Sequence, residues 1–193
     1  KDGKQQTVLV EKILVSVGRT PNSGGLNMDS GIKIDDRGFI QFGDYYQTDV
    51  PGIYAIGDVV KTPLLAHVAS KEGEIAVEHI AGISGATRVD LMTVPAATYC
   101  EPQVASFGYS EKRALELGID YKKAVFPYRG AGKAVVSEKV EGMVKILTAP
   151  DTGEILGGHI IGAEATELIH ELLLARSSEL LPLDITSMIH AHP

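Results

Sequence analysis

The feature that most constrains this chain's fold is a pair of apolar runs, residues 142–148 and 155–161, joined by the turn Pro150-Asp151-Thr152-Gly153. Two strand-like runs joined by so short a turn pair as antiparallel neighbours. A helix is predicted next, over 164–176, because apolar residues recur there at helical spacing: Ala165, Leu168, Ile169, Leu172 and Leu173. We therefore expect an antiparallel sheet and a helix whose apolar stripe is either core or subunit interface.

Further short elements are predicted before this hairpin. Strands are expected at 96–99 and 104–107, around Glu101-Pro102, and at 124–126. Between them Ser110 has the side chain of an N-cap for a helix over 111–117, which Gly118 ends. The second half of the chain thus has the pattern of an α+β domain.

The last helix is expected to begin at the N-cap Asp184, with a hydrophobic staple between Leu183 and Met188. Pro193 disfavours helical geometry at His192, so the helix should end by about Ala191. His192 would then project from a helix end, where its side chain would be well placed to transfer a proton. His190 and His192 do not share a helix face, so we expect no metal site here.

The first half has an α/β pattern. Residues 12–17 and 52–58 are predicted to be buried strands that end at Gly18 and at Gly57-Asp58, and 31–34 and 38–41 short strands. Ligands of open α/β sheets bind beyond such strand ends. Gly18 could admit a ligand or simply turn the chain, and Asp58 could accept hydrogen bonds from sugar-like hydroxyls or cap the next helix.

That next helix is predicted over 65–81, with one face of small residues that suits close packing on a sheet or against a flat ligand: Ala66, Ala69, Gly73, Ala76, Val77 and Ile80. Its N-terminal end offers free N–H groups to an electron-rich ligand. His67 lies in the first turn, where a lone histidine more often makes a local structural contact than acts as a catalyst.

Composition limits the function. The 193 residues are 44% hydrophobic with a net charge of −7, which disfavours nucleic-acid and anionic-membrane surfaces, and no run is long enough to span a membrane. The single cysteine, Cys100, excludes an internal disulfide and fits a reducing compartment such as the cytoplasm. We expect it to be a small, partly buried apolar residue rather than a reactive thiol.

Four motifs occur in one order and together resemble the pyridine nucleotide–disulfide oxidoreductases, in particular the branch that oxidises dihydrolipoamide: residues 17–22 (VGRTPN), 48–58 (TDVPGIYAIGD), 65–67 (LAH) and 190–193 (HAHP). The resemblance implies that 1–22 end a Rossmann-like NAD-binding domain. It implies that 23–92 are the returning central segment of the FAD region. Residues 93–193 would be an interface domain, an antiparallel sheet with flanking helices that forms the homodimer.

The resemblance also implies roles for single residues. Gly18 would lie against bound NAD, Asp58 would hold the ribityl chain of FAD, and Leu64, Leu65, Ala66 and His67 would line the flavin ring. His192 would be the catalytic base, supplied by the partner subunit, that takes a proton when a dithiol attacks a disulfide. Electrons would pass through FAD to NAD⁺, and the expected partners are lipoyl domains of 2-oxoacid dehydrogenase complexes.

The chain departs from the family pattern at three points. It has no N-terminal dinucleotide fingerprint, no redox cysteine pair, and no glutamate after His192 to orient the imidazole. Because it opens on Lys1, we expect it to be the C-terminal portion of an enzyme and inactive by itself. The alternatives are a sibling disulfide reductase of the glutathione or mercuric type, or a non-catalytic dimerisation module.

Overall fold

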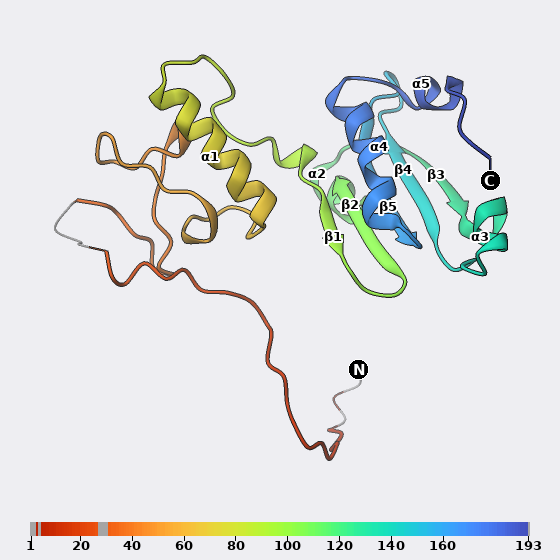
Figure 1. Ribbon diagram of the computed structural model, residues 1–193, viewed down its shortest axis with the longest axis horizontal. Helices are drawn as coiled ribbons and strands as arrows, with labels where there is room; N and C mark the ends of the chain where they lie inside the picture. The colour runs from red at the N-terminus through yellow and green to blue at the C-terminus, as the bar shows by residue number, and fades with distance from the viewer. Residues whose placement is uncertain (1–2, 4, 27–30, 193) are drawn as a thin grey trace. The chain divides into compact units, whose positions relative to one another are not determined.

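The computed structural model describes residues 3, 5–26 and 31–192, which divide into two compact units, Lys1–Arg88 and Val89–Pro193 (Figure 1). Each unit is described by itself. None of the helices in the described ranges combines the length and the hydropathy that a membrane-spanning helix needs.

The second unit is built on one five-stranded antiparallel sheet, in the order β1-β2-β5-β4-β3 (Figure 1). The hairpin predicted at 142–148 and 155–161 is confirmed as β4 and β5, and the shorter strands fall where the sequence places them. The strands are β1 Ala96–Thr98, β2 Gln103–Gly108, β3 Lys122–Pro127, β4 Met143–Thr148 and β5 Ile155–Gly162.

Helix α4 (Ala165–Ser177) packs on one face of this sheet and forms the core with it. Ile160 of β5 pairs in register with Ala105 of β2, so both side chains point to this face, and both are buried. The α4 residues Ala165, Ile169 and Leu172 are buried with them, whereas Leu168 is 47% exposed. The predicted stripe is therefore mostly core, and Leu168 turns away from it.

Two glycines of β5 allow close approach on both faces of the sheet. A side chain at Gly157 would collide with the backbone oxygen of Tyr109, and one at Gly158 would place its Cβ 2.7 Å from the ring of Phe107. Since real Cβ atoms do not approach so closely, the sheet can pack in this way only with glycine at both positions.

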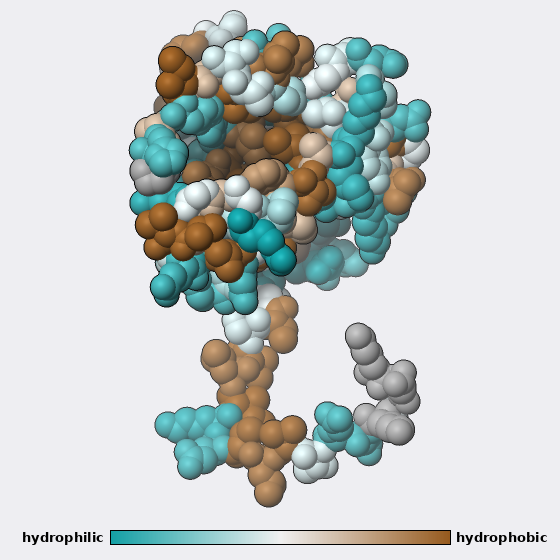
Figure 2. Space-filling model, turned by 90° about the vertical axis from the view of Figure 1, so that its right-hand side faces the viewer, coloured by the Kyte–Doolittle hydropathy of each residue, from teal (hydrophilic) through white to brown (hydrophobic). Residues whose placement is uncertain are grey.

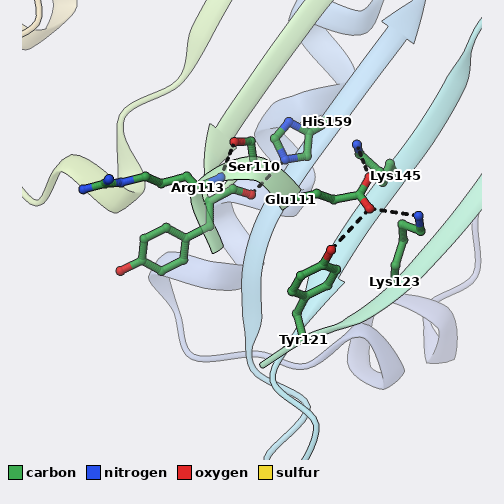
Figure 3. Close-up of polar contacts among 8 residues, drawn as sticks. Ser110, Glu111, Arg113, Tyr121, Lys123, Lys145 and His159 are labelled. Carbon is green, nitrogen blue, oxygen red and sulfur yellow. Dashed lines mark hydrogen bonds and ion pairs between the residues drawn. The ribbon is translucent and has the colours of Figure 1, made fainter. Parts of the chain in front are cut away.

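Helix α2 (Glu111–Leu117) is anchored on the other side of the sheet, as Figure 3 shows. The predicted caps are confirmed: Ser110 Oγ accepts from Arg113 N, and Gly118 has φ +67°. Glu111 accepts hydrogen bonds from Lys123 of β3 and Lys145 of β4, both at 2.8 Å. These two lysines lower the pKa of Glu111 to about 2, so the carboxylate stays charged and holds the helix to two strands.

The last helix, α5 (Pro182–Ser187), differs from its prediction at both ends. Leu181 is its N-cap, and Asp184 lies inside the helix, where Oδ2 accepts from Leu181 N at 2.7 Å. The predicted staple is wrong, since Leu183 and Met188 are both exposed. The helix ends at Ser187 because Met188 is extended (ψ 152°), so His192 does not lie at a helix end.

The second unit also contains three short helices: η4 Leu91–Thr93, η5 Tyr128–Gly130 and α3 Gly132–Val136.

Cys100 follows β1 and is exposed, so the expectation of a partly buried cysteine is wrong. Its Sγ lies 3.1 Å from the oxygen of Pro102.

The first unit is organised around helix α1 (Ala66–Ile80), which confirms the helix predicted at 65–81. The predicted face of small residues is only partly right: Ala76 is buried, but Ala66, Val77 and Ile80 are exposed. The buried residues are instead Val68, Glu72, Ile75 and Ala76. The rest of the unit is turns, η2 (Asp44–Tyr46), η3 (Gly57–Val59) and isolated bridges.

The two long strands predicted in this unit do not form. Residues 12–17 pair with no strand within the described ranges, and Leu14 is 91% exposed. Figure 2 shows an extended stretch of hydrophobic residues that faces solvent in this part of the chain. Residues 52–58 make one bridge, Gln47 to Tyr54, and the predicted short strands near residues 34 and 40 reduce to the bridge between Ile34 and Ile40. A strand needs a neighbour that pairs with its backbone along its length, and these segments make at most isolated bridges within the described residues.

Candidate functional site

The Gly57-Asp58 turn is fixed against helix α1 by two contacts. Gly57 has φ +71°, and a side chain there would place its Cβ 3.2 Å from Cβ of Ala69 on α1. Its N–H donates to Glu72 Oε2 at 2.7 Å. Glu72 has no exposed surface, and its Oε1 is buried without a hydrogen-bond partner among the residues that the structure describes. The buried carboxyl group therefore holds the backbone immediately before Asp58.

Asp58 itself faces solvent beside Arg19. Arg19 Nη1 lies 2.5 Å from Asp58 Oδ2, and the aspartate side chain is 43% exposed. This ion pair brings Gly18 and Asp58 together, although 40 positions separate them in the sequence. Asp58 does not cap α1, whose N-cap is Leu65, so the helix-cap alternative for Asp58 is wrong.

Gly18 has φ +142°, a backbone conformation that side chains rarely adopt, and a Cβ built there would meet nothing within 4 Å. The position therefore requires glycine for its backbone conformation, with open space beside it. Both alternatives for Gly18, a turn and a close approach to a ligand, are compatible with this geometry.

The residues Leu64, Leu65, Ala66 and His67 lead into α1. Leu64 and Leu65 are partly buried, whereas Ala66 and His67, the first two helical residues, are exposed. The first-turn N–H groups of a helix lack intrahelical acceptors and carry partial positive charge. An exposed alanine at this end lets a flat, electron-rich group come close to those donors.

The C-terminal segment carries the other predicted residue, His192, which is exposed. Two positions earlier, His190 Nε2 lies 2.8 Å from Glu171 Oε1 on α4. The hydrogen bond and the charge of Glu171 raise the pKa of His190. Sequence reasoning missed both Glu171 and Glu72, because on a helix each is one glutamate among several.

An apolar hollow of about 470 Å³ lies in the second unit between β3, α3 and α4. Its lining includes Phe126, Tyr128, Ala134 and Leu168, with Lys133 and Lys139 as cationic members. Phe126 is 54% exposed and Leu168 47%, so large apolar side chains of this hollow face solvent.

The structure thus brings Gly18, through Arg19, next to Asp58, and ties the turn before Asp58 to the helix that begins after Leu65. His192 belongs to the other unit. Over the described ranges, no three His, Cys, Asp or Glu side chains gather as a metal site requires.

Comparisons with known proteins match both units. The family model described as "Pyridine nucleotide-disulphide oxidoreductase, dimerisation domain" matches residues 94–193, and "Pyridine nucleotide-disulphide oxidoreductase" matches 1–73. A dihydrolipoyl dehydrogenase of Corynebacterium glutamicum is 45% identical over 98% of the chain and 41% of its own length. One of Bacillus subtilis is 41% identical over 99% of the chain and 40% of its own length.

Solved structures agree with this match. The crystal structure of LpdA from Mycobacterium tuberculosis superposes with a TM-score of 0.84 at 28% identity, over 90% of this chain and 38% of that one. The chain therefore spans about two fifths of the length of the relatives that it matches.

Proposed function

The chain belongs to the pyridine nucleotide–disulphide oxidoreductases, and we propose that it is the C-terminal part of a dihydrolipoamide dehydrogenase. Such an enzyme oxidises protein-bound dihydrolipoamide through a redox disulfide and reduces NAD⁺. The observation that carries the proposal is the match, at 41–45% identity over nearly the whole chain, to enzymes named dihydrolipoyl dehydrogenase.

The residues of the first unit fit FAD as the cofactor. Asp58 offers a solvent-facing carboxylate that can accept hydrogen bonds from the hydroxyls of a ribityl chain, and Glu72 fixes the turn that carries it. Leu64, Leu65, Ala66 and His67 would lie along the flavin, where the start of α1 supplies N–H donors. When bound, FAD supplies the two-electron acceptor between a dithiol and NAD⁺.

Gly18 would lie against NAD, because its backbone conformation excludes side chains and the space beside it is open. Arg19, paired with Asp58 in this chain, is well placed to fix Gly18 relative to the flavin-binding turn. The Arg19–Asp58 ion pair would therefore hold the proposed NAD contact at Gly18 close to the proposed FAD contact at Asp58.

His192 would act as acid and base in the disulfide chemistry. The thiolate, not the thiol, attacks a disulfide, so a dithiol substrate must first lose a proton. An imidazole titrates near neutral pH and can both accept that proton and return it. The exposure of His192 leaves its ring free to reach a thiol.

We assign the apolar hollow of the second unit to the homodimer interface. Its exposed apolar lining, with Val135 (55%) and Val136 (74%) on α3, is the kind of surface that a second copy buries. The matched dimerisation-domain family supports this assignment. In such a dimer His192 would serve the disulfide of the partner subunit.

The reducing compartment that we propose is the cytoplasm. The macromolecular partners that we propose are lipoyl domains of 2-oxoacid dehydrogenase complexes.

A substrate panel tests the proposal with the full-length protein that contains these residues. We expect bound flavin with visible absorbance, and NADH formation from dihydrolipoamide that exceeds the reduction of glutathione disulfide or mercuric ion. Preference for either of the latter would assign the protein to a sibling branch. A colourless dimer would support a non-catalytic dimerisation module instead.

A further inference from the structure

The segment after α5 is attached to α4 by a charged hydrogen bond. His190 Nε2 and Glu171 Oε1 are 2.8 Å apart, and both side chains are partly exposed, by 51% and 44%. The neighbouring residue Ile189 is fully exposed, so apolar packing of its side chain does not hold this part of the segment. The polar contact to Glu171 is therefore an anchor for residues that otherwise extend into solvent.

Glu171 is itself a fixed point. Its α4 neighbours Ile169 and Leu172 are buried in the core, and Arg176 near the end of the helix bonds Glu154 at 2.7 Å. The helix is thus secured along its length, and Glu171 projects from its solvent side. A group bonded to Glu171 is held relative to the sheet.

We propose that Glu171, acting through His190, is a positioning residue for His192. The inference rests on the proposed role of His192. Only Ala191 separates the two histidines, and a chain spans at most about 3.6 Å per residue. The Cα of His192 therefore lies within roughly 7 Å of the Cα of His190. Anchoring His190 restricts the positions that the His192 ring can sample.

The anchor depends on pH. The groups that face His190 are the Glu171 carboxylate on α4 and the backbone of Met188. Since the pKa of His190 is raised, the charged pair is complete below the ordinary histidine pKa of 6.5. It is lost as the pH rises through the raised value. Above it, the ring is neutral, so its N–H can still donate to the Glu171 carboxylate but the attraction between opposite charges is gone.

The first measurement uses histidine-labelled NMR of the 193-residue chain and needs no activity. Glu171→Gln should lower the pKa of His190 and increase the fast motion of residues 188–192. The matched control is Glu167→Gln, which removes an exposed carboxylate one turn earlier on the same helix. An unchanged His190 titration in Glu171→Gln would show that the pair does not form, and the proposal would be wrong.

The second measurement uses the full-length, FAD-loaded enzyme. Exposed ion pairs are worth up to about 1 kcal/mol, so we expect Glu171→Gln to lower kcat for dihydrolipoamide by about 2- to 5-fold. The KM for NAD⁺ should not change, and the alkaline side of the pH profile should shift, whereas Glu167→Gln should change neither. An altered His190 titration with an unchanged kcat and pH profile would overturn the positioning role. A wild-type enzyme that does not oxidise dihydrolipoamide would overturn the proposed function, and the positioning role with it, although the NMR result would stand.

Discussion

Removing the Glu72 carboxyl group should loosen helix α1 selectively. In Glu72→Ala the Gly57 N–H, now donated to Glu72 Oε2 at 2.7 Å, loses its acceptor in a site with no exposed surface. An unsatisfied buried donor costs about 1–3 kcal/mol, and the vacated side-chain volume adds to this. Glu72→Gln keeps an oxygen acceptor of the same shape, so we expect its cost to be below about 1 kcal/mol.

Hydrogen exchange of the α1 amides, read by mass spectrometry on the 193-residue chain, measures this difference. A loss of 1–3 kcal/mol corresponds to exchange roughly 5- to 150-fold faster in Glu72→Ala. The control Glu74→Ala removes an exposed carboxylate from the same helix and should change stability by no more than about 0.5 kcal/mol. The reasoning is refuted if Glu72→Ala exchanges like Glu74→Ala, or if Glu72→Gln exchanges as fast as Glu72→Ala.

The second unit gives three further predictions, each measured by urea unfolding. Ile169→Ala empties a fully buried site and should cost about 2–5 kcal/mol, while Leu174→Ala, at a position 66% exposed, should cost little. Glu111 has a pKa of about 2 in the fold against an ordinary 4.5. The stability that its carboxylate contributes is therefore complete above pH 4.5 and is lost as the pH falls through 2. Glu111→Gln should remove that acid-dependent loss of stability. Gly157→Ala should prevent folding of the sheet because its methyl would overlap the Tyr109 backbone, whereas Gly132→Ala, whose methyl meets nothing within 4 Å, should be tolerated.

Sequence patterns predicted the β4–β5 hairpin and helix α2 of the second unit because these signals are local and agree with one another. The turn at 150–153 sets the pairing of β4 with β5, and the caps Ser110 and Gly118 delimit α2. The turn and the two caps each depend only on residues that lie within a few positions of one another. The sheet order follows because every strand finds its neighbour inside the same unit.

The long strands predicted in the first unit did not form, because a strand also requires neighbouring strands that pair with its backbone along its length. Residues 12–17 have the β-branched composition of a buried strand, yet no segment in the described ranges pairs with them. The prediction of where α5 ends was wrong for a different reason. The prediction took Pro193 as the signal that ends the helix, but the backbone leaves helical geometry at Met188.

Site residues divide in a similar way. Gly18, Asp58 and His192 are proposed from motifs that resemble those of the family, because such motifs are visible in a sequence. Glu72 and Glu171 were not, since their partners lie 15 and 19 positions away and only the fold brings them into contact. Their contacts become evident only from burial and distance in the fold, not from residue type.

The measurement that tests the central claim most directly is dihydrolipoamide oxidation by the full-length, flavin-loaded enzyme with His192→Gln. Loss of a positioned acid–base group costs about 10²- to 10⁴-fold in rate, and we expect a loss in that range with flavin content unchanged. His170→Gln, at an exposed position on α4, should keep the wild-type rate. A His192→Gln enzyme that oxidises dihydrolipoamide as fast as the His170→Gln enzyme would contradict the assignment of His192 as the proton-transfer residue.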